Sequence, residues 1–318
     1  MEKKFVVGVD VGGLTSKIGI VSEQGEVLVQ TVIRSDVYGD DANAFLDALG
    51  EAILQVIKDA GKEGQVRGIG AGAPNGNYYT GQIANAPNLA WAADHAVDFA
   101  KILSAKTGLP VSLTNDANAA AIGEMTYGAA RGMKNFIMIT LGTGVGSGIV
   151  IDGKLVYGAD GFAGELGHVI IEKNGRQCGC GRKGCLEAYC SATGVTRTAL
   201  EWIANTDEPS LLRNYEKPSG KDVFDCAKQG DAMAKRIFDY TGTLLGEALA
   251  NFIAFSAPEA IVLFGGLARN KEFLTEPILK AMNENVLPLW KDKVKLVYTE
   301  LKESDAAILG ASALAWEL

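Results

Sequence analysis

A cluster of metal-binding residue types lies between residues 165 and 187. His168 is followed by Cys178, Cys180 and Cys185, and a closed set of three thiolates and one imidazole is typical of structural zinc, which keeps no position open for a reacting water. Clustered cysteines could be chance thiols, but the histidine, one of two in the chain, favours a metal. We predict one zinc ion per chain, with a tight backbone path around it at glycines 179, 181 and 184.

Carboxylates flank this cluster, with Glu165 before His168 and Glu187 after the last cysteine. A third carboxylate, Asp116, follows the apolar run of residues 109–113 and opens an alanine-rich segment, so taken alone it could be a helix N-cap. Together with the amide of Asn115, these groups suit a ligand with many hydroxyls, because unpaired polar groups in a site penalise a ligand that lacks one.

Two glycine-rich turns lie between apolar segments in the two halves of the chain. Residues 5–21 read as an apolar strand, a turn at Gly12 and Gly13, and a second apolar strand, which predicts a β-hairpin. Residues 135–151 repeat this pattern, with Gly12 falling on Gly142 and Ile20 on Val150. The chain is therefore expected to be internally duplicated.

Turns of this kind suit phosphate, because glycine has no Cβ to keep phosphate oxygens away from backbone N–H groups. A single turn would be weak evidence, but one in each half could hold a polyphosphate from both sides. Asp10 could meet a phosphate-bound Mg²⁺, an ion usually held by one or two carboxylates and substrate phosphates. A further strand that ends in Gly265 and Gly266 could flank the nucleoside.

Two other nucleotide motifs are excluded. The chain has no G-x-x-x-x-G-K-[ST] segment, so it has no P-loop. The dinucleotide pattern G-x-G-x-x-G occurs at residues 179–184, but it lies inside the cysteine loop and no strand precedes it.

Composition narrows the class of protein. The 318 residues are 47% hydrophobic and 21% charged, which is ordinary for a globular protein of two domains. The net charge of −8, without a basic run, argues against nucleic-acid binding. The apolar run of residues 5–11 is far shorter than a membrane helix, and cysteines that bind metal suit a reducing compartment. We expect a cytoplasmic protein without a membrane partner.

Strands and amphipathic helices alternate in both halves. Residues 40–60 illustrate a helix, with Phe45, Leu49, Ile53 and Ile57 on one face and Gly61 as its stop. Residues 205–221 are expected to be a loop, and residues 304–317 a closing helix that crosses back onto the first half. We expect a smaller N-terminal α/β domain (1–116 plus 304–318) and a larger one (117–303) that carries the zinc loop.

These motifs together resemble the ROK family (repressor, open reading frame, kinase), especially its bacterial glucokinases, from Phe5 to the end of the chain. The resemblance rests on the Asp10-x-Gly-Gly loop, Asn115-Asp116, Leu141-Gly-Thr-Gly-x-Gly, Glu165-x-Gly-His168, the cysteine motif and Phe264-Gly-Gly. It implies a two-domain α/β architecture, the actin/hexokinase-like ATPase (ribonuclease H-like) fold with a cleft between the domains.

The resemblance also implies the reaction, an in-line transfer of the γ-phosphoryl group of Mg-ATP to a sugar hydroxyl. Asp116 would be the catalytic base, and His168 would face both zinc and sugar. The sugar would be held by Asn75, Gly76, Asn88, Asn115, Asp116, Glu165, His168 and Glu187. The nucleotide would be held by Asp10, Gly12, Gly13, Thr15, Lys17, Gly142, Thr143, Gly144, Gly265 and Gly266.

Two positions depart from the family pattern. Leu14 stands where the family usually has threonine, which leaves open which hydroxyl of Leu14-Thr15-Ser16 meets phosphate. Asn75 stands where many members have glycine, in a loop expected near the sugar. We predict a hexose 6-kinase acting on glucose, with an N-acetylhexosamine kinase as the alternative and a non-catalytic sugar-responsive regulator as a further one. Polyphosphate is an alternative donor, and a homodimer is expected.

Overall fold

The computed structural model describes residues 3–318 and divides the chain into two compact units. Unit 1 contains residues 3–133, Lys154–Ala163 and Thr299–Leu318, and unit 2 contains Lys134–Gly153 and Gly164–Tyr298. The first boundary differs from the one expected at residue 117. Of the helices in the described chain, none is long and apolar enough to cross a membrane.

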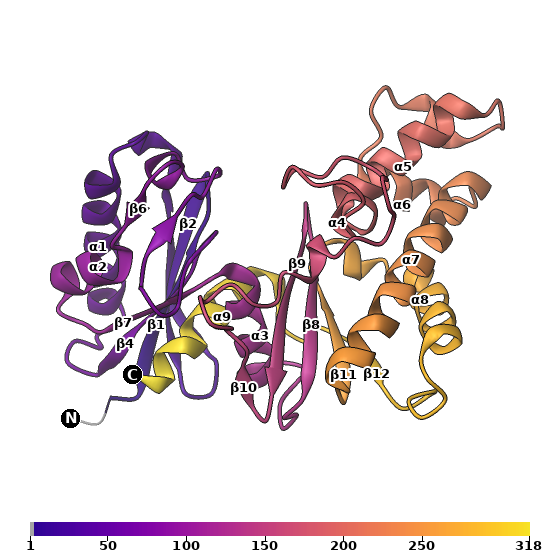
Figure 1. The fold of residues 1–318 in the computed structure, drawn as a ribbon. Coiled ribbons are helices and arrows are strands. Elements are labelled where there is room, and N and C mark those ends of the chain that lie inside the picture. Colours follow the sequence, from indigo (N-terminus) through magenta and orange to yellow (C-terminus); the bar gives the residue numbers. More distant parts are fainter. Residues whose placement is uncertain (1–2) are drawn as a thin grey trace. The chain divides into compact units, whose positions relative to one another are not determined.

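Unit 1 is built on a five-stranded sheet in the order β3-β2-β1-β4-β7 (Figure 1). The pairs β1–β2 and β2–β3 are antiparallel, and β1–β4 and β4–β7 are parallel. The strands are β1 (Phe5–Val11), β2 (Thr15–Ser22), β3 (Val27–Arg34), β4 (Val66–Gly72) and β7 (Val111–Thr114), and a small sheet pairs β5 (Ile83–Ala84) with β6 (Ala96–Val97).

The helices of unit 1 follow the predicted patterns. α1 (Ala42–Asp59) begins where the Asp41 side chain accepts a hydrogen bond from Ala44 N at 3.0 Å, and its predicted apolar face is buried. The Phe45 ring stacks on Trp91 with 4.8 Å between centroids. The other helices are α2 (Phe99–Thr107), α3 (Asp116–Tyr127) and α9 (Glu303–Ala313), with 3₁₀ turns η1 (Asp36–Tyr38), η2 (Ala90–Ala92) and η6 (Leu314–Glu317).

Small residues let α9 pack closely on the sheet and on α3. A Cβ at Gly123 of α3 would lie 2.7 Å from the Cα of Gly310 in α9, and a Cβ at Gly8 of β1 would overlap the Ile308 carbonyl. This close packing keeps α3 in unit 1 and explains why the alanine-rich helix does not start a new unit. The closing helix predicted for residues 304–317 is confirmed as α9 with η6.

A second five-stranded sheet has the order β10-β9-β8-β11-β12, and its strands β9, β8, β11 and β12 belong to unit 2. β8 and β9 are antiparallel, and β8–β11 and β11–β12 are parallel. The strands are β8 (Phe136–Leu141), β9 (Val145–Ile151), β10 (Lys154–Leu155), β11 (Ala260–Phe264) and β12 (Lys295–Tyr298). The strand order and the directions of these three pairs follow those of β1–β2, β1–β4 and β4–β7 in unit 1, so the predicted duplication is confirmed.

The alignment of the two hairpins needs one correction. In unit 1 the pair Val11↔Ser16 encloses residues 12–15, whereas in unit 2 the pair Leu141↔Val145 encloses residues 142–144. The second turn is thus one residue shorter, and Ile20, the partner of Val7, corresponds to Ile149 and not to Val150. The two hairpins therefore align with one constant difference in residue number before the turn, and that difference is smaller by one after it.

Helices α7 and α8 form the largest helical contact of unit 2 and lie side by side in Figure 1. A Cβ at Gly242 of α7 would lie 2.6 Å from Pro277 of α8, so the glycine makes room for the proline. The predicted loop at 205–221 contains a short 3₁₀ turn. The helical elements are η3 (Leu166–His168), α4 (Glu187–Cys190), α5 (Ala192–Asn205), η4 (Leu211–Asn214), α6 (Gly220–Lys228), α7 (Ala232–Ser256), η5 (Leu267–Arg269) and α8 (Lys271–Asn285).

Candidate active site and metal centre

The first glycine turn has a conformation that requires glycine. Gly12 N donates to Thr15 O at 3.1 Å, and a Cβ at Gly12 would lie 2.7 Å from that oxygen. A Cβ at Gly13 would overlap the carbonyl of Asn88, which places this predicted sugar residue against the turn. The Ser16 hydroxyl is buried and 2.8 Å from the Ser35 hydroxyl, while Thr15 is exposed. Thr15 is therefore the accessible hydroxyl of this turn.

Asp10 and Asp116 form a pair of interacting carboxylates in unit 1. The pKa of Asp10 is raised to about 6, chiefly by burial and then by the negative charge of Asp116, while Lys17, its register partner on β2, opposes the rise. Desolvation by surrounding protein also raises the pKa of Asp116, although solvent reaches this residue and hydrogen bonding from Ala117 N opposes the rise. Repulsion within this pair is the kind that a divalent cation relieves, so Asp10 fits the predicted magnesium site.

The N-cap of α3 is Asn115 and not Asp116. The Asn115 side chain accepts a hydrogen bond from Asn118 N at 2.7 Å, and Asp116 is the first helical residue. The Asp116 Oδ1 accepts only from its neighbour Ala117 N, at 2.9 Å, among the hydrogen bonds of its side chain to other described residues. The alternative role as a cap therefore belongs to the preceding asparagine.

The loop after β4 packs beside this carboxylate. A Cβ at Gly72 would lie 3.6 Å from the Cα of Asp116, and a Cβ at Gly76 would overlap the Thr114 carbonyl. Asn75 has a positive φ of 53°, which explains why glycine suits this position, and its amide nitrogen donates to the carbonyls of Ala84 and Asn85 at 3.2 and 2.6 Å. The asparagine thus ties the two arms of its loop together.

The second glycine turn is bonded on several sides within unit 2. Gly142 N donates to Gly144 O at 3.0 Å, and Ala192 N donates to Gly142 O at 2.8 Å. A Cβ at Gly265, whose φ is 101°, would lie 2.6 Å from Leu141 O, so β11 ends directly against the turn. This arrangement brings together all the glycines predicted for the nucleotide in unit 2.

A cavity of about 680 Å³ opens beside Gly142, Thr143 and Gly266. Sequence reasoning missed most of its wall, although the Ser219–Asp222 capping box at the start of α6 marks part of it. Phe224 and Leu267 give it apolar surface, which suits a nucleobase. The remaining lining residues are Ala192, Ser219, Gly220, Lys221, Asp225, Arg269 and Asn270.

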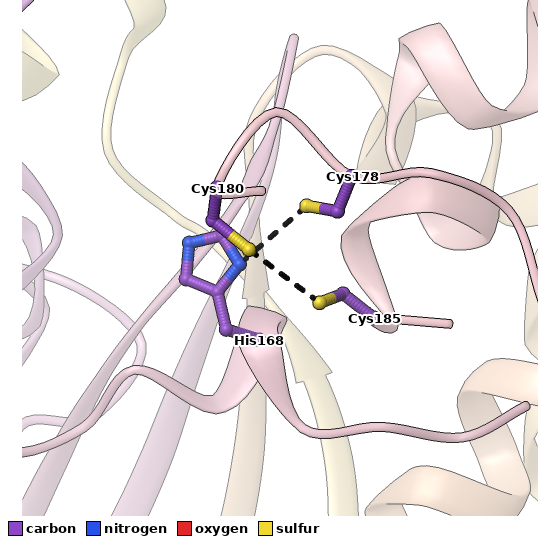
Figure 2. A group of neighbouring side chains, drawn as sticks. All are labelled: His168, Cys178, Cys180 and Cys185. Atoms are coloured by element: carbon purple, nitrogen blue, oxygen red, sulfur yellow. Dashed lines mark hydrogen bonds between the residues drawn. The ribbon is translucent and has the colours of Figure 1, made fainter. Parts of the chain in front are cut away.

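The four predicted metal ligands converge on one point, as Figure 2 shows. Their ligand atoms lie within 4.8 Å of one another, with Cys180 Sγ 3.7 Å from Cys185 Sγ and Cys178 Sγ 3.7 Å from His168 Nδ1. Bonds of about 2.3 Å to sulfur and 2.0 Å to nitrogen give tetrahedral edges of roughly 3.5 to 3.8 Å. The donor set and its spacing fit zinc.

The local backbone explains part of this convergence. Gly181 and Gly184 have φ values of 86° and 79°, which other residues rarely adopt, whereas Gly179 is not among the positive-φ residues and has open space at its Cβ. The expectation that glycine 179 is needed for the wrap is therefore wrong. Burial raises the pKa of the Cys178 thiol to about 12, so a thiolate here needs a compensating cation.

Glu187 connects the metal cluster with the second glycine turn. Its Oε2 accepts from Val145 N at 3.0 Å, and its Oε1 lies 3.4 Å from Cys178 Sγ. His168 ends η3, and Glu165, which is exposed, precedes this 3₁₀ turn. The predicted polar residues of unit 2 thus lie directly before and after the cysteine loop.

Comparisons with known proteins agree with this description. A profile described as the ROK family matches residues 6–317. A glucokinase from Halalkalibacterium halodurans is 37% identical over 99% of this chain and 96% of its own length, and a glucokinase from Thermotoga maritima is 36% identical over 99% and 98%. The crystal structure of a ROK family glucokinase from Streptomyces griseus in complex with glucose and AMPPNP has a TM-score of 0.79 at 31% identity and covers 99% of this chain and 100% of that chain.

These likenesses confirm the predicted actin/hexokinase-like α/β fold and extend over nearly the whole chain. The motifs that carried the resemblance, from the Asp10 turn to Phe264-Gly-Gly, all lie within the matched residues. This protein belongs to the ROK family.

Proposed function

We propose that this protein transfers the γ-phosphoryl group of Mg-ATP to the 6-hydroxyl of a hexose, with glucose as the first substrate. The observation that carries the proposal is the Asp116 carboxyl, which is accessible, next to Asp10, and has a pKa above its ordinary value. A carboxylate of raised pKa is a stronger base, as deprotonation of an alcohol requires. The similarity to glucokinases supports the choice of sugar.

In the proposed reaction Asp116 accepts the proton of the sugar hydroxyl. The sugar oxygen then bonds to the γ-phosphorus while the bond from that phosphorus to the bridging oxygen of ADP breaks. Asn115 and Asn88 would hold other hydroxyls in unit 1, and Glu165, His168 and Glu187 would do so in unit 2. General-base assistance of this kind typically contributes about 10² to 10⁴ in rate.

The nucleotide would occupy the cavity of unit 2 and the two glycine turns. Backbone N–H groups of Gly12, Gly13, Gly142 and Gly144 would face the phosphates, and Thr15 would add a hydroxyl. Asp10 would hold the magnesium ion, which neutralises the charge of the phosphates when bound. Lys17, beside Asp10 in the sheet register, would add positive charge.

The cysteine cluster would hold one structural zinc ion. With His168 Nδ1 on the metal, the other ring nitrogen is left for a sugar hydroxyl, and the metal fixes the tautomer and orientation of the ring. Thiolate ligands favour the cytoplasm as the location of the protein. The homodimer expected from the family stays a prediction.

The decisive experiment follows ADP release from Mg-ATP with glucose, mannose, fructose, N-acetylglucosamine and N-acetylmannosamine. We expect glucose to be preferred, and Asp116→Asn to bind it normally but to lose about 10² to 10⁴ in turnover. Asp207→Asn, an exposed carboxylate of unit 2, is the matched control and should be fully active. Preference for an acetylated sugar would establish the alternative substrate class, and no turnover by folded, zinc-loaded protein with ATP or polyphosphate would refute the kinase assignment.

A further inference from the structure

One segment of unit 1 reaches the proposed sugar residues from an unexpected part of the sequence. Residues 154–163 belong to unit 1, although residues 134–153 before them and 164–298 after them belong to unit 2. We call residues 156–163 the strap. Nothing in its sequence, Val-Tyr-Gly-Ala-Asp-Gly-Phe-Ala, marks it as functional. Glu165, a proposed sugar ligand, follows it by two residues.

The strap is fixed to the loop that follows β4. The ring of Tyr157 stacks on Tyr78 with 4.0 Å between centroids and 9° between planes, which is the closest aromatic pair described in this chain. The Tyr79 hydroxyl donates to Gly158 O at 2.9 Å, and the buried Asn77 amide donates to Asp160 O at 2.6 Å. Three consecutive residues of the loop that carries Asn75 and Gly76, namely 77–79, therefore contact the strap.

Asn77 links this attachment to the shape of the loop itself. Its side-chain oxygen accepts from the backbone N–H groups of Tyr79 and Thr80 at 3.0 and 3.1 Å, which closes a tight turn. A Cβ at Gly161 of the strap would lie 2.6 Å from the Asn77 amide nitrogen, and Gly161 has a φ of 89°. The strap backbone thus fits against the turn at a distance that only glycine allows.

Tyr157 also reaches the strand that leads to the proposed base. The side chain of Thr114, the last residue of β7 and two positions before Asp116, interacts with the Tyr157 hydroxyl and opposes the rise in its pKa that burial causes. The Thr114 hydroxyl in turn accepts from the Asn118 amide at 3.3 Å, and Asn118 N is the donor to the Asn115 cap. Because Thr114 has one hydroxyl proton and gives its lone pair to Asn118, that proton is available for the Tyr157 oxygen.

We propose that Tyr157 is a positioning residue for the part of the sugar site in unit 1. Its ring fixes the loop of Asn75 and Gly76 through Tyr78, and its hydroxyl fixes the end of β7 that carries Asn115 and Asp116. This inference rests on the proposed function for what the site binds, but the clamp itself rests on contacts within unit 1.

Kinetic tests separate this role from a general effect on stability. Tyr157→Leu removes the stack and the hydroxyl, and should raise the KM for glucose about tenfold while the KM for Mg-ATP changes less than about twofold. Tyr157→Phe keeps the stack and should leave the KM for glucose nearly unchanged while kcat falls about threefold. Tyr215→Phe, at an exposed tyrosine of unit 2 outside the clamp, is the matched control and should change neither value by more than about twofold.

Amide hydrogen exchange tests the clamp without relying on catalysis. Tyr157→Leu should accelerate exchange about tenfold in residues 75–81 and 114–118, and leave the sheet of unit 2 unchanged. If the wild-type protein phosphorylates no sugar, the proposed function fails while this measurement still decides the clamp. Unchanged exchange in both segments, or an unchanged KM for glucose in an active, folded Tyr157→Leu variant, would overturn the inference.

Discussion

The hairpins of the two units share a frame and differ in the chemistry they carry. At the same place before the turn, β1 has Asp10 and β8 has Thr140, in register with Lys17 and Gly146 respectively. Asp10 is a carboxyl whose pKa is raised to about 6, chiefly by burial and then by a second carboxylate. The Thr140 hydroxyl instead accepts a hydrogen bond from Gly146 N at 3.0 Å. The hairpin of unit 1 thus carries a carboxyl whose charge is unfavourable, whereas the matching position of unit 2 is neutral and its hydroxyl has a hydrogen-bond partner.

The two turns also differ in what supports them. In unit 1 the turn is packed against the Asn88 backbone and is closed by the bond from Gly12 N to Thr15 O. In unit 2 the turn is bonded to Ala192 N and, next to it, Val145 N is bonded to Glu187, whose other oxygen faces the metal cluster. This chain thus concentrates interacting charges in one copy of the hairpin, whereas the other copy is held by hydrogen bonds and lies beside the predicted metal ligands.

Loss of the metal should produce the largest effect and should fall on unit 2. Zinc binds Cys- and His-containing sites with roughly 10 to 16 kcal/mol, so Cys180→Ser or chelation should strongly lower the stability of unit 2 and accelerate hydrogen exchange in residues 164–190. The zinc content, measured by metal analysis, should fall from one ion per chain to none. Cys226→Ala, whose thiol lies outside the cluster, should keep its zinc. A zinc-free, fully active wild-type preparation would refute the metal site.

Removing the charge from the first hairpin should abolish most activity without loss of fold. Asp10→Asn keeps the size of the side chain but removes the proposed magnesium ligand, so turnover should fall about 10²-fold or more and the Mg²⁺ concentration for half-maximal rate should rise. Steady-state rates over a magnesium titration measure both. The same turnover and magnesium dependence in the variant as in wild type would remove Asp10 from the site.

The difference in unfolding free energy between Asp10→Asn and wild type should depend on pH, because the Asp10 charge destabilises the folded state. The folded-state pKa of Asp10 is raised from 3.8 to about 6, so the folded state binds the proton more tightly than the unfolded state. The stabilisation from the protonated form is therefore present below pH 4 and is lost as the pH rises through 6. After allowance for partial exposure, the Asp10→Asn variant should gain about 2 kcal/mol in unfolding free energy over wild type between pH 4 and pH 7.

Urea denaturation at a series of pH values without magnesium measures this gain. Asp207→Asn, in an exposed loop, should show no such trend and serves as the control. Added magnesium should reduce the gain, because a bound cation offsets the repulsion in the wild-type protein. If the difference in unfolding free energy between variant and wild type stayed constant across the pH range, the folded structure would not disfavour the charged form of Asp10.

The sequence predicted elements and motifs well because each has a local physical signature. The hairpins, α1, the alanine-rich α3 and the four metal ligands follow from periodicity, glycine placement and donor types within short stretches. The boundary at Met133 and the strap did not follow, since they depend on packing between residues far apart in sequence, such as Gly123 on Gly310 and Tyr157 on Tyr78.

Other details also depend on geometry that the sequence does not reveal. The sequence left open whether Asp116 caps α3, and only the structure shows that the Asn115 side chain reaches Asn118 N. The register after the second turn was wrong by one residue, because a constant offset cannot detect a shorter turn. The cavity wall formed by α6 and η5 was missed, since its residues come from separate segments without a shared motif.

The smallest effect should come from the neutral copy of the hairpin. Thr140→Val preserves shape but leaves Gly146 N without its acceptor, and because Gly146 is only half-buried, water can partly replace that bond. The variant should lose about 1 kcal/mol in unfolding free energy and keep turnover within about threefold of wild type. Urea denaturation and steady-state kinetics measure the two values together. A loss of turnover as large as that of Asp10→Asn would show that the two copies share the chemistry, and the comparison would have to be abandoned.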